Sequence, residues 1–141
     1  MVEQKALSIH SSESEQAVLG SVLLDETCFE LVKDFIPEKE VFYQIKNQSI
    51  WEVICELKKE NIPVDIVNVS TKLDNMTYYV TGLVDSVPTT ANVISYARQL
   101  NSDWLRRKLV TQSQEIASKA KDNSNDISSL LVNVHDTASS L

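Results

Sequence analysis

Glycine and proline are scarce in this chain. Its 141 residues contain only two glycines, Gly20 and Gly82, and three prolines. Because both residue types mark turns and are disfavoured inside helices, their scarcity argues against a turn-rich sheet protein. The composition, 43% hydrophobic and 23% charged, is that of a soluble globular chain long enough to bury its own core. We therefore predict an all-α fold.

Cysteine and long apolar runs are also scarce. Cys28 and Cys55 stand alone, with no CxxC spacing and no neighbouring cluster of cysteine and histidine, so we predict no metal site and two reduced thiols. No apolar run reaches the length of a signal peptide core or a membrane span. These absences predict a cytoplasmic protein that makes no contact with membranes.

Positive charge is in deficit. The formal net charge is -7, and residues 1–60 carry twelve acidic against six basic side chains. Because neutralisation of phosphate charge dominates non-specific binding to nucleic acids, we expect this chain to bind DNA weakly or not at all.

Catalytic and cofactor-binding motifs are absent as well. A phosphate-binding loop of the form GxxxxGK[ST] cannot be built from two glycines as far apart as Gly20 and Gly82. Neither His10 nor His135 has a serine or cysteine placed convincingly beside it as a nucleophile. We predict no catalytic residue, no cofactor and no enzymatic activity for this chain.

The pattern of apolar residues divides the chain into three parts. We expect a flexible segment at 1–11, a globular head of about six short helices at 12–101, and an antiparallel helical hairpin at 102–141. In the head, Ser12 and Glu15 have the spacing of a capping box that opens the first helix, and Gly20 predicts close approach of a second helix. Further head helices are expected at 29–36, 43–60, 65–73, 78–86 and 89–100.

The hairpin is predicted from two apolar stripes. Trp104 begins a helix with Leu105, Leu109 and Ile116 on one side, and the polar residues 122–126 form the connection. The second helix repeats apolar residues at a 4-3-4-3 spacing, typical of a packed helix pair: Ile127, Leu131, Val134, Ala138 and Leu141.

Two helices alone bury too little apolar surface to be stable, so we expect another copy of the chain to cover them. The predicted interface with this copy or another partner comprises Trp104, Leu105, Arg106, Arg107, Leu109, Ile116, Ile127, Leu131, Val134 and Ala138. Because the apolar stripe reaches Leu141, we also expect the natural chain to continue beyond this residue.

Two charged clusters allow alternative interpretations. Arg106, Arg107 and Lys108 could contact DNA, could form salt bridges to another subunit, or could be a solvated helix face. Two acidic residues, Glu38 and Glu40, flank Lys39. They could hold a metal or a partner but are more typical of a solvated loop.

Several dispersed segments resemble the amino-terminal domain of DnaB-type replicative DNA helicases. The run SESEQAVLG is similar to the family's EAEQ-x-x-LG, VFYQIKNQSIW resembles F-x-x-x-x-H-x-x-I-[FW], and IPVDIVNV resembles P-[IV]-D-[LI]-V-x-[LV]. The segments VPTTANVISYARQL and WLRRKL match the family most closely. The chain departs from the pattern at Asn47, where the family usually has histidine, and in LDNMTYYVTGL, which is shorter than usual and lacks the usual glycines.

The resemblance implies a helical head and hairpin that pack as dimers into a three-fold collar above a six-membered ring of ATPase domains. In relatives the collar recruits the carboxy-terminal domain of primase and, in some systems, the helicase loader. ATP, magnesium and DNA unwinding would belong to a carboxy-terminal domain outside this chain. A stand-alone helical adaptor that regulates helicase loading is one alternative, and a nucleic-acid-binding module using Arg106, Arg107 and Lys108 is another.

Overall fold

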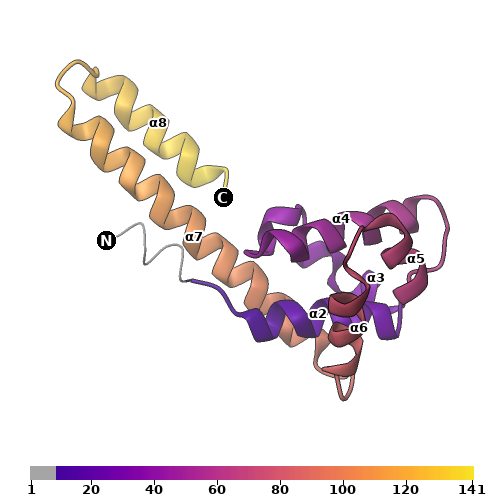
Figure 1. Ribbon diagram of the computed structural model, residues 1–141. Coiled ribbons are helices and arrows are strands. Elements are labelled where there is room, and N and C mark those ends of the chain that lie inside the picture. The colour runs from indigo at the N-terminus through magenta and orange to yellow at the C-terminus, as the bar shows by residue number, and fades with distance from the viewer. Residues whose placement is uncertain (1–8) are drawn as a thin grey trace. The chain divides into compact units, whose positions relative to one another are not determined.

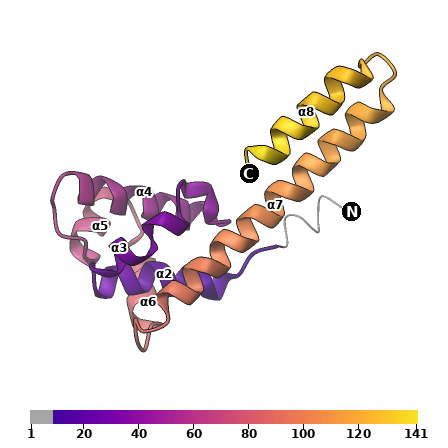
Figure 2. The ribbon, with the colours of Figure 1, turned by 180° about the vertical axis from the view of Figure 1, so that it is seen from behind.

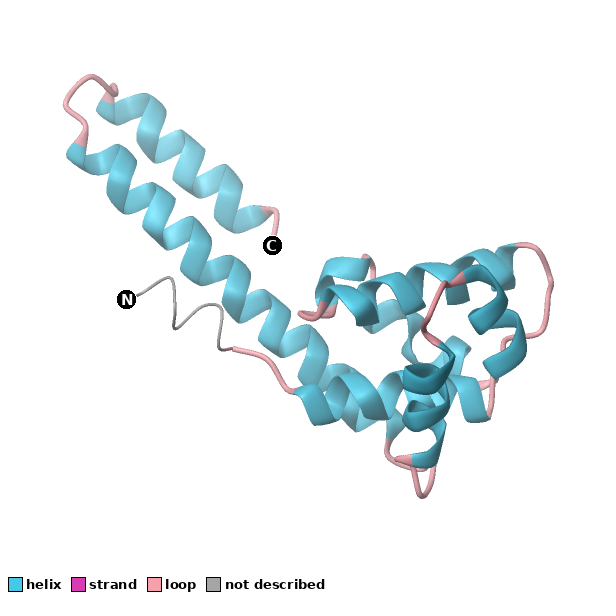
Figure 3. Ribbon diagram, in the orientation of Figure 1, coloured by secondary structure: helices cyan, strands magenta, loops and turns pink. Residues whose placement is uncertain are grey.

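The computed structural model describes residues 9–141, and within this range it contains helices and no strand (Figures 1 and 3). The elements in chain order are α2 (Ser12–Leu24), α3 (Cys28–Val32), η1 (Lys33–Phe35), η2 (Lys39–Val41), α4 (Ile45–Lys59), α5 (Ile66–Lys72), α6 (Thr77–Asp85), α7 (Val93–Lys121) and α8 (Ile127–Ser139). The predicted all-α fold is confirmed.

The chain divides into two compact units. The head comprises His10–Trp104, and the second unit includes Ile9 and Leu105–Leu141. Helix α7 contributes its first part to the head and the remainder to the second unit, which we call the hairpin. The flexible segment predicted at 1–11 falls largely on residues 1–8, which lie outside the described residues.

The core of the head forms around α2. Val18, Leu19 and Val22 are fully buried on this helix, and Ile50 and Ile54 of α4 are fully buried with them. Phe29 and Phe42 pack on Trp51, with ring centroids 5.4 Å and 5.7 Å away. Trp51 therefore serves the core of the head, as expected for an aromatic residue without an accompanying basic groove.

The close helix approach predicted at Gly20 is confirmed. A Cβ atom at Gly20 would collide with the carbonyl oxygen of Leu83 in α6 and would lie 2.5 Å from Cγ2 of Val87. Only glycine lets α2 and α6 come this near. Helix α6 itself forms as predicted, despite the strand propensity of residues 77–81, because Val80 and Leu83 are buried one helical turn apart.

The capping box predicted at the start of α2 is wrong. The capping residue is Ser11, whose side-chain oxygen accepts a hydrogen bond from Ser14 N at 3.1 Å. Glu15 does not reach back to the first turn, because its carboxylate is buried and accepts hydrogen bonds from residues 43–47. The local spacing was therefore overridden by a tertiary contact.

The break predicted near residues 101–103 is also wrong, because α7 is one continuous helix from Val93 to Lys121. Asn101 and Asp103 are polar residues that can compete with the helix backbone for hydrogen bonds. Here neither side chain competes with the backbone hydrogen bonds of α7. Asn101 Nδ2 donates to Phe35 O at 2.9 Å, and Asp103 Oδ1 accepts from Gln99 Nε2 at 2.9 Å.

Candidate functional site

The hairpin consists of the second part of α7 and the whole of α8, which run antiparallel and side by side (Figures 1 and 2). Its connection occupies the predicted residues. Asp126 caps α8 by accepting from Ser129 N at 3.0 Å. Asp122 accepts from the backbone and hydroxyl of Ser124 at 3.0 Å and 2.7 Å, and these hydrogen bonds hold its carboxyl pKa below the usual value. The turn is thus specified by local side-chain bonds.

Helix α8 presents two apolar edges. Leu130, Val134 and Thr137 are half-buried at a 4-3 spacing, and they mark the edge turned toward α7. Ile127 and Leu131 lie on the neighbouring edge and are 64% and 63% exposed. Ala138 continues this second edge and is exposed too, and Leu141, which follows the end of α8, is also exposed. We call the set Ile127, Leu131 and Ala138 the outer edge of α8.

Of the residues predicted as an interface on α8, only Val134 is half-buried within the hairpin. The stripe predicted from the sequence is therefore not the contact between the two helices, apart from Val134. The sequence did not distinguish the two edges, because Leu130, Val134 and Thr137 lie within the same arc of the helix as the outer edge. On the second part of α7, Leu105 and Ile116 are half-buried, whereas Leu109 is 50% exposed.

The residues at the junction between the two units have separate roles. Trp104 is half-buried against the core of the head. Arg106 is exposed, whereas Arg107 is half-buried and donates from Nη1 to Ile9 O at 2.9 Å. The guanidinium of Arg107 is thus engaged with the chain's own backbone, so the three basic residues do not form one uniform surface for phosphates.

A buried polar network in the head was not predicted from the sequence. The Glu15 carboxylate accepts from Tyr43 N at 2.9 Å, from Gln44 N at 3.3 Å and from Asn47 Nδ2 at 2.8 Å. Asn47 Oδ1 accepts from the Tyr79 hydroxyl at 2.6 Å. Burial raises the pKa of the Tyr79 phenol, and the hydrogen bond to Asn47 partly opposes this effect. The network joins α2, α4 and α6 and fixes their relative positions.

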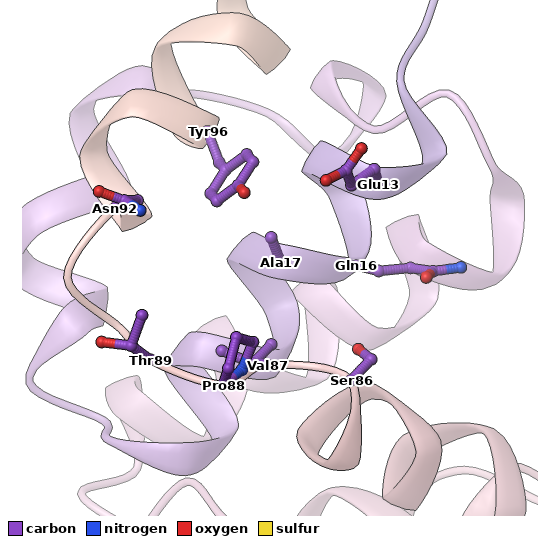
Figure 4. Close-up of a pocket in the computed structure, with 9 residues that line it drawn as sticks. All are labelled: Glu13, Gln16, Ala17, Ser86, Val87, Pro88, Thr89, Asn92 and Tyr96. Carbon is purple, nitrogen blue, oxygen red and sulfur yellow. The ribbon is translucent and has the colours of Figure 1, made fainter.

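One cavity of about 420 Å³ opens in the head between α2 and the segment that joins α6 to α7 (Figure 4). Nine residues line it: Glu13, Gln16, Ala17, Ser86, Val87, Pro88, Thr89, Asn92 and Tyr96. Sequence reasoning did not identify this cavity, which depends on the approach of two segments distant in the chain.

Residues 9–141 contain no group of three or more His, Cys, Asp or Glu side chains arranged to hold a metal ion. Cys28 is buried and Cys55 half-buried, and burial raises the pKa of both thiols. Over the same residues, no helix combines the length and apolar character needed to cross a bilayer.

Comparisons with known proteins agree on one family. The family model of the DnaB-like helicase N terminal domain matches residues 8–102. The replicative DNA helicase DnaC of Bacillus subtilis is 30% identical over 128 residues, which cover 84% of this chain and 28% of the relative. The replicative DNA helicase DnaB of Geobacillus stearothermophilus is 33% identical over 130 residues, which cover 86% of this chain and 28% of the relative.

The fold agrees with a solved structure. The crystal structure of the N-terminal domain of DnaB helicase from Mycobacterium tuberculosis matches with a TM-score of 0.83 and 23% identity, over 93% of this chain and 96% of that chain. The chain spans 28% of the length of the two full-length relatives. With the family model covering residues 8–102, the sequence resemblance and the helical fold converge, and the chain belongs to the DnaB-like helicase N-terminal domain family.

Proposed function

We propose that this chain is the collar of a hexameric replicative helicase, a non-catalytic scaffold that associates with copies of itself through the hairpin. The observation that carries this proposal is the outer edge of α8, where Ile127 and Leu131 are each more than 60% exposed. Fully burying one such side chain contributes about 1.5–3 kcal/mol. A contiguous apolar edge of this kind is typical of a surface that a partner covers.

A second copy of this chain is the partner that the pattern favours. The outer edge has members near both ends of α8, and Leu109 of α7 adds a further exposed leucine to the hairpin. We include Leu105, Ile116 and Val134 in this interface because they are only half-buried, and Trp104, Arg106 and Arg107 because they flank it in the sequence.

The catalytic work of such a helicase belongs outside this chain. We propose that the full-length protein binds ATP and magnesium in a carboxy-terminal domain and uses hydrolysis to unwind DNA in the cytoplasm. The chain covers 28% of the replicative helicases that it resembles, which leaves room for that domain. Reading the gene beyond Leu141 distinguishes this proposal from a stand-alone adaptor, because only the helicase continues into a GxxxxGK[ST] sequence.

Self-association is tested by two matched variants. Leu131→Asp places a charge on the outer edge, whereas Val132→Asp places it one residue further along α8, where the side chain is 61% exposed on a different face. We expect sedimentation velocity to show smaller oligomers or monomers for Leu131→Asp. Val132→Asp should show the same distribution of oligomer sizes as the wild type. Equal distributions for both variants and the wild type would rule out the outer edge as the interface.

Primase is the proposed external partner, through its carboxy-terminal domain, and the helicase loader is a further candidate. The acidic excess of residues 1–60 supports a partner with a basic surface. Co-precipitation of this chain with a carboxy-terminal primase fragment should succeed and should weaken as salt is raised. Failure to bind at both low and high salt would remove primase from the proposal.

A further inference from the structure

Three contacts hold the segment that forms one wall of the cavity in the head. Val87 is held against Gly20 of α2, where no Cβ atom intervenes. The Ser86 hydroxyl donates to Leu83 O at 2.8 Å, and Thr89 Oγ1 accepts from Ala91 N at 3.2 Å. These contacts involve both ends of the segment between α6 and α7, which forms one wall of the cavity.

Six of the nine residues that line the cavity have polar side chains: Glu13, Gln16, Ser86, Thr89, Asn92 and Tyr96. Figure 4 shows the Glu13 carboxylate and the Tyr96 hydroxyl turned toward one another above Ala17, while the Gln16 amide points away. Val87 and Pro88 lie on the opposite side of the same space. The cavity thus combines an acceptor group and an aromatic ring with an apolar wall.

The charge of the cavity has one sign. Glu13 is the only charged residue among the nine that line it. Over residues 9–141 no Lys, Arg or His nitrogen lies within 4.0 Å of this carboxylate, and neither it nor the Tyr96 hydroxyl takes part in a side-chain hydrogen bond. The carboxylate and the phenol are therefore both available to a ligand.

A guanidinium group fits this arrangement best. Its planar set of N–H donors can serve the Glu13 carboxylate and the Tyr96 oxygen together. An ammonium group is a point charge and lacks this planar set of donors, while the apolar wall at Val87 and Pro88 suits the methylene stem of a long side chain. A cavity of about 420 Å³ is of the size that encloses a small ligand group.

We propose that this cavity is a binding site for an arginine side chain presented by a segment of a partner protein. The acidic excess of residues 1–60, which include Glu13, attracts a basic segment and disfavours an acidic one. All nine lining residues belong to the head, so occupation of the cavity does not require association of the hairpin.

The test uses NMR titration of the ¹⁵N-labelled chain with three blocked pentapeptides that differ only at the central residue: arginine, lysine or citrulline, between alanines. We expect saturable shifts for the arginine peptide at the amides of Ala17, Val87 and Asn92. The lysine peptide should bind more weakly, and the uncharged citrulline peptide more weakly again. A fourth titration uses blocked arginine alone. It should bind more weakly than the arginine peptide if the ligand is a protein segment.

Two variants and one control complete the test. Glu13→Gln should lower the affinity for the arginine peptide by about two- to fivefold, the range of one solvent-accessible ion pair. Adding Tyr96→Phe to this variant should lower the affinity further. Asp85→Asn removes an exposed acid near the end of α6 that does not line the cavity, and it should leave the affinity unchanged. The spectra also report whether each variant is folded.

Three results would overturn the proposal. The first is the absence of saturable shifts at the cavity for the arginine peptide, and the second is equal affinity for the arginine and citrulline peptides. The third is an equal effect of Glu13→Gln and Asp85→Asn. That result would show that the peptide is attracted by the general negative charge of the head and not by the cavity.

Discussion

The Nδ2 atom of Asn47 donates a hydrogen bond of 2.8 Å to the buried carboxylate of Glu15, while its Oδ1 atom accepts from a third residue, Tyr79. Asn47 is fully buried, so both of its polar atoms depend on these partners. One side chain of α4 thereby connects α2 with α6.

Asn47→Leu should destabilise the head strongly. The substitution keeps the branched shape of the side chain but leaves the Tyr79 hydroxyl without its acceptor and removes one donor from the buried carboxylate of Glu15. We expect a loss of about 2–4 kcal/mol in the free energy of unfolding. Urea denaturation followed by tryptophan fluorescence measures it. Ser49→Ala, at a half-buried position of the same helix whose hydroxyl only donates to Ile45 O, should change stability by less than about 0.5 kcal/mol.

The two glycines should respond to alanine in opposite ways. A Cβ atom at Gly20 would overlap Leu83 O, whereas no atom lies within 4 Å of one at Gly82. We expect Gly20→Ala to destabilise the head by about 1–3 kcal/mol and Gly82→Ala to stabilise it by up to about 1 kcal/mol. Thermal unfolding of the two variants measures both effects. A Gly20→Ala protein as stable as the wild type would contradict the close approach of α2 and α6.

The stability of the head should fall in alkali because of Tyr79. Burial raises the pKa of its phenol in the folded chain, so the unfolded chain, with a pKa of about 10, releases the proton first. The contribution of Tyr79 is therefore fully present below about pH 10 and is lost as the pH rises through the folded pKa. Urea denaturation across this range should show a smaller decline for Tyr79→Phe than for the wild type. Tyr78→Phe is the control, since Tyr78 is 94% exposed and should leave the decline unchanged.

Much of the fold could be predicted from the sequence because its helix boundaries depend on local signals. Pro37 follows the short helical segment 28–35, and Asp65 caps α5 by accepting from Asn68 N, in agreement with the helices expected at 29–36 and 65–73. Periodicity placed α4 correctly, since Ile50, Ile54 and Leu57 share one buried face.

The remaining features depend on contacts between distant residues. Glu15 had the spacing of a capping residue, but its carboxylate is bonded to residues 43–47. Asn101 had the character of a helix breaker, but its amide bonds to Phe35 O, and α7 continues. The outer edge of α8 could not be separated from the edge that faces α7, because only the position of the neighbouring helix distinguishes Leu130 from Leu131.

The central claim is that the outer edge of α8 meets another copy of the chain, and isotope-filtered NOE spectroscopy tests it most directly. A mixture of ¹³C-labelled and unlabelled chains reports only contacts between different molecules. The account predicts intermolecular NOEs at the methyl groups of Ile127 and Leu131 and none at Val132, which lies on another face of the helix. A chain that stays at its monomer mass of 15.9 kDa at NMR concentration, or that shows intermolecular NOEs only away from Ile127 and Leu131, would contradict it.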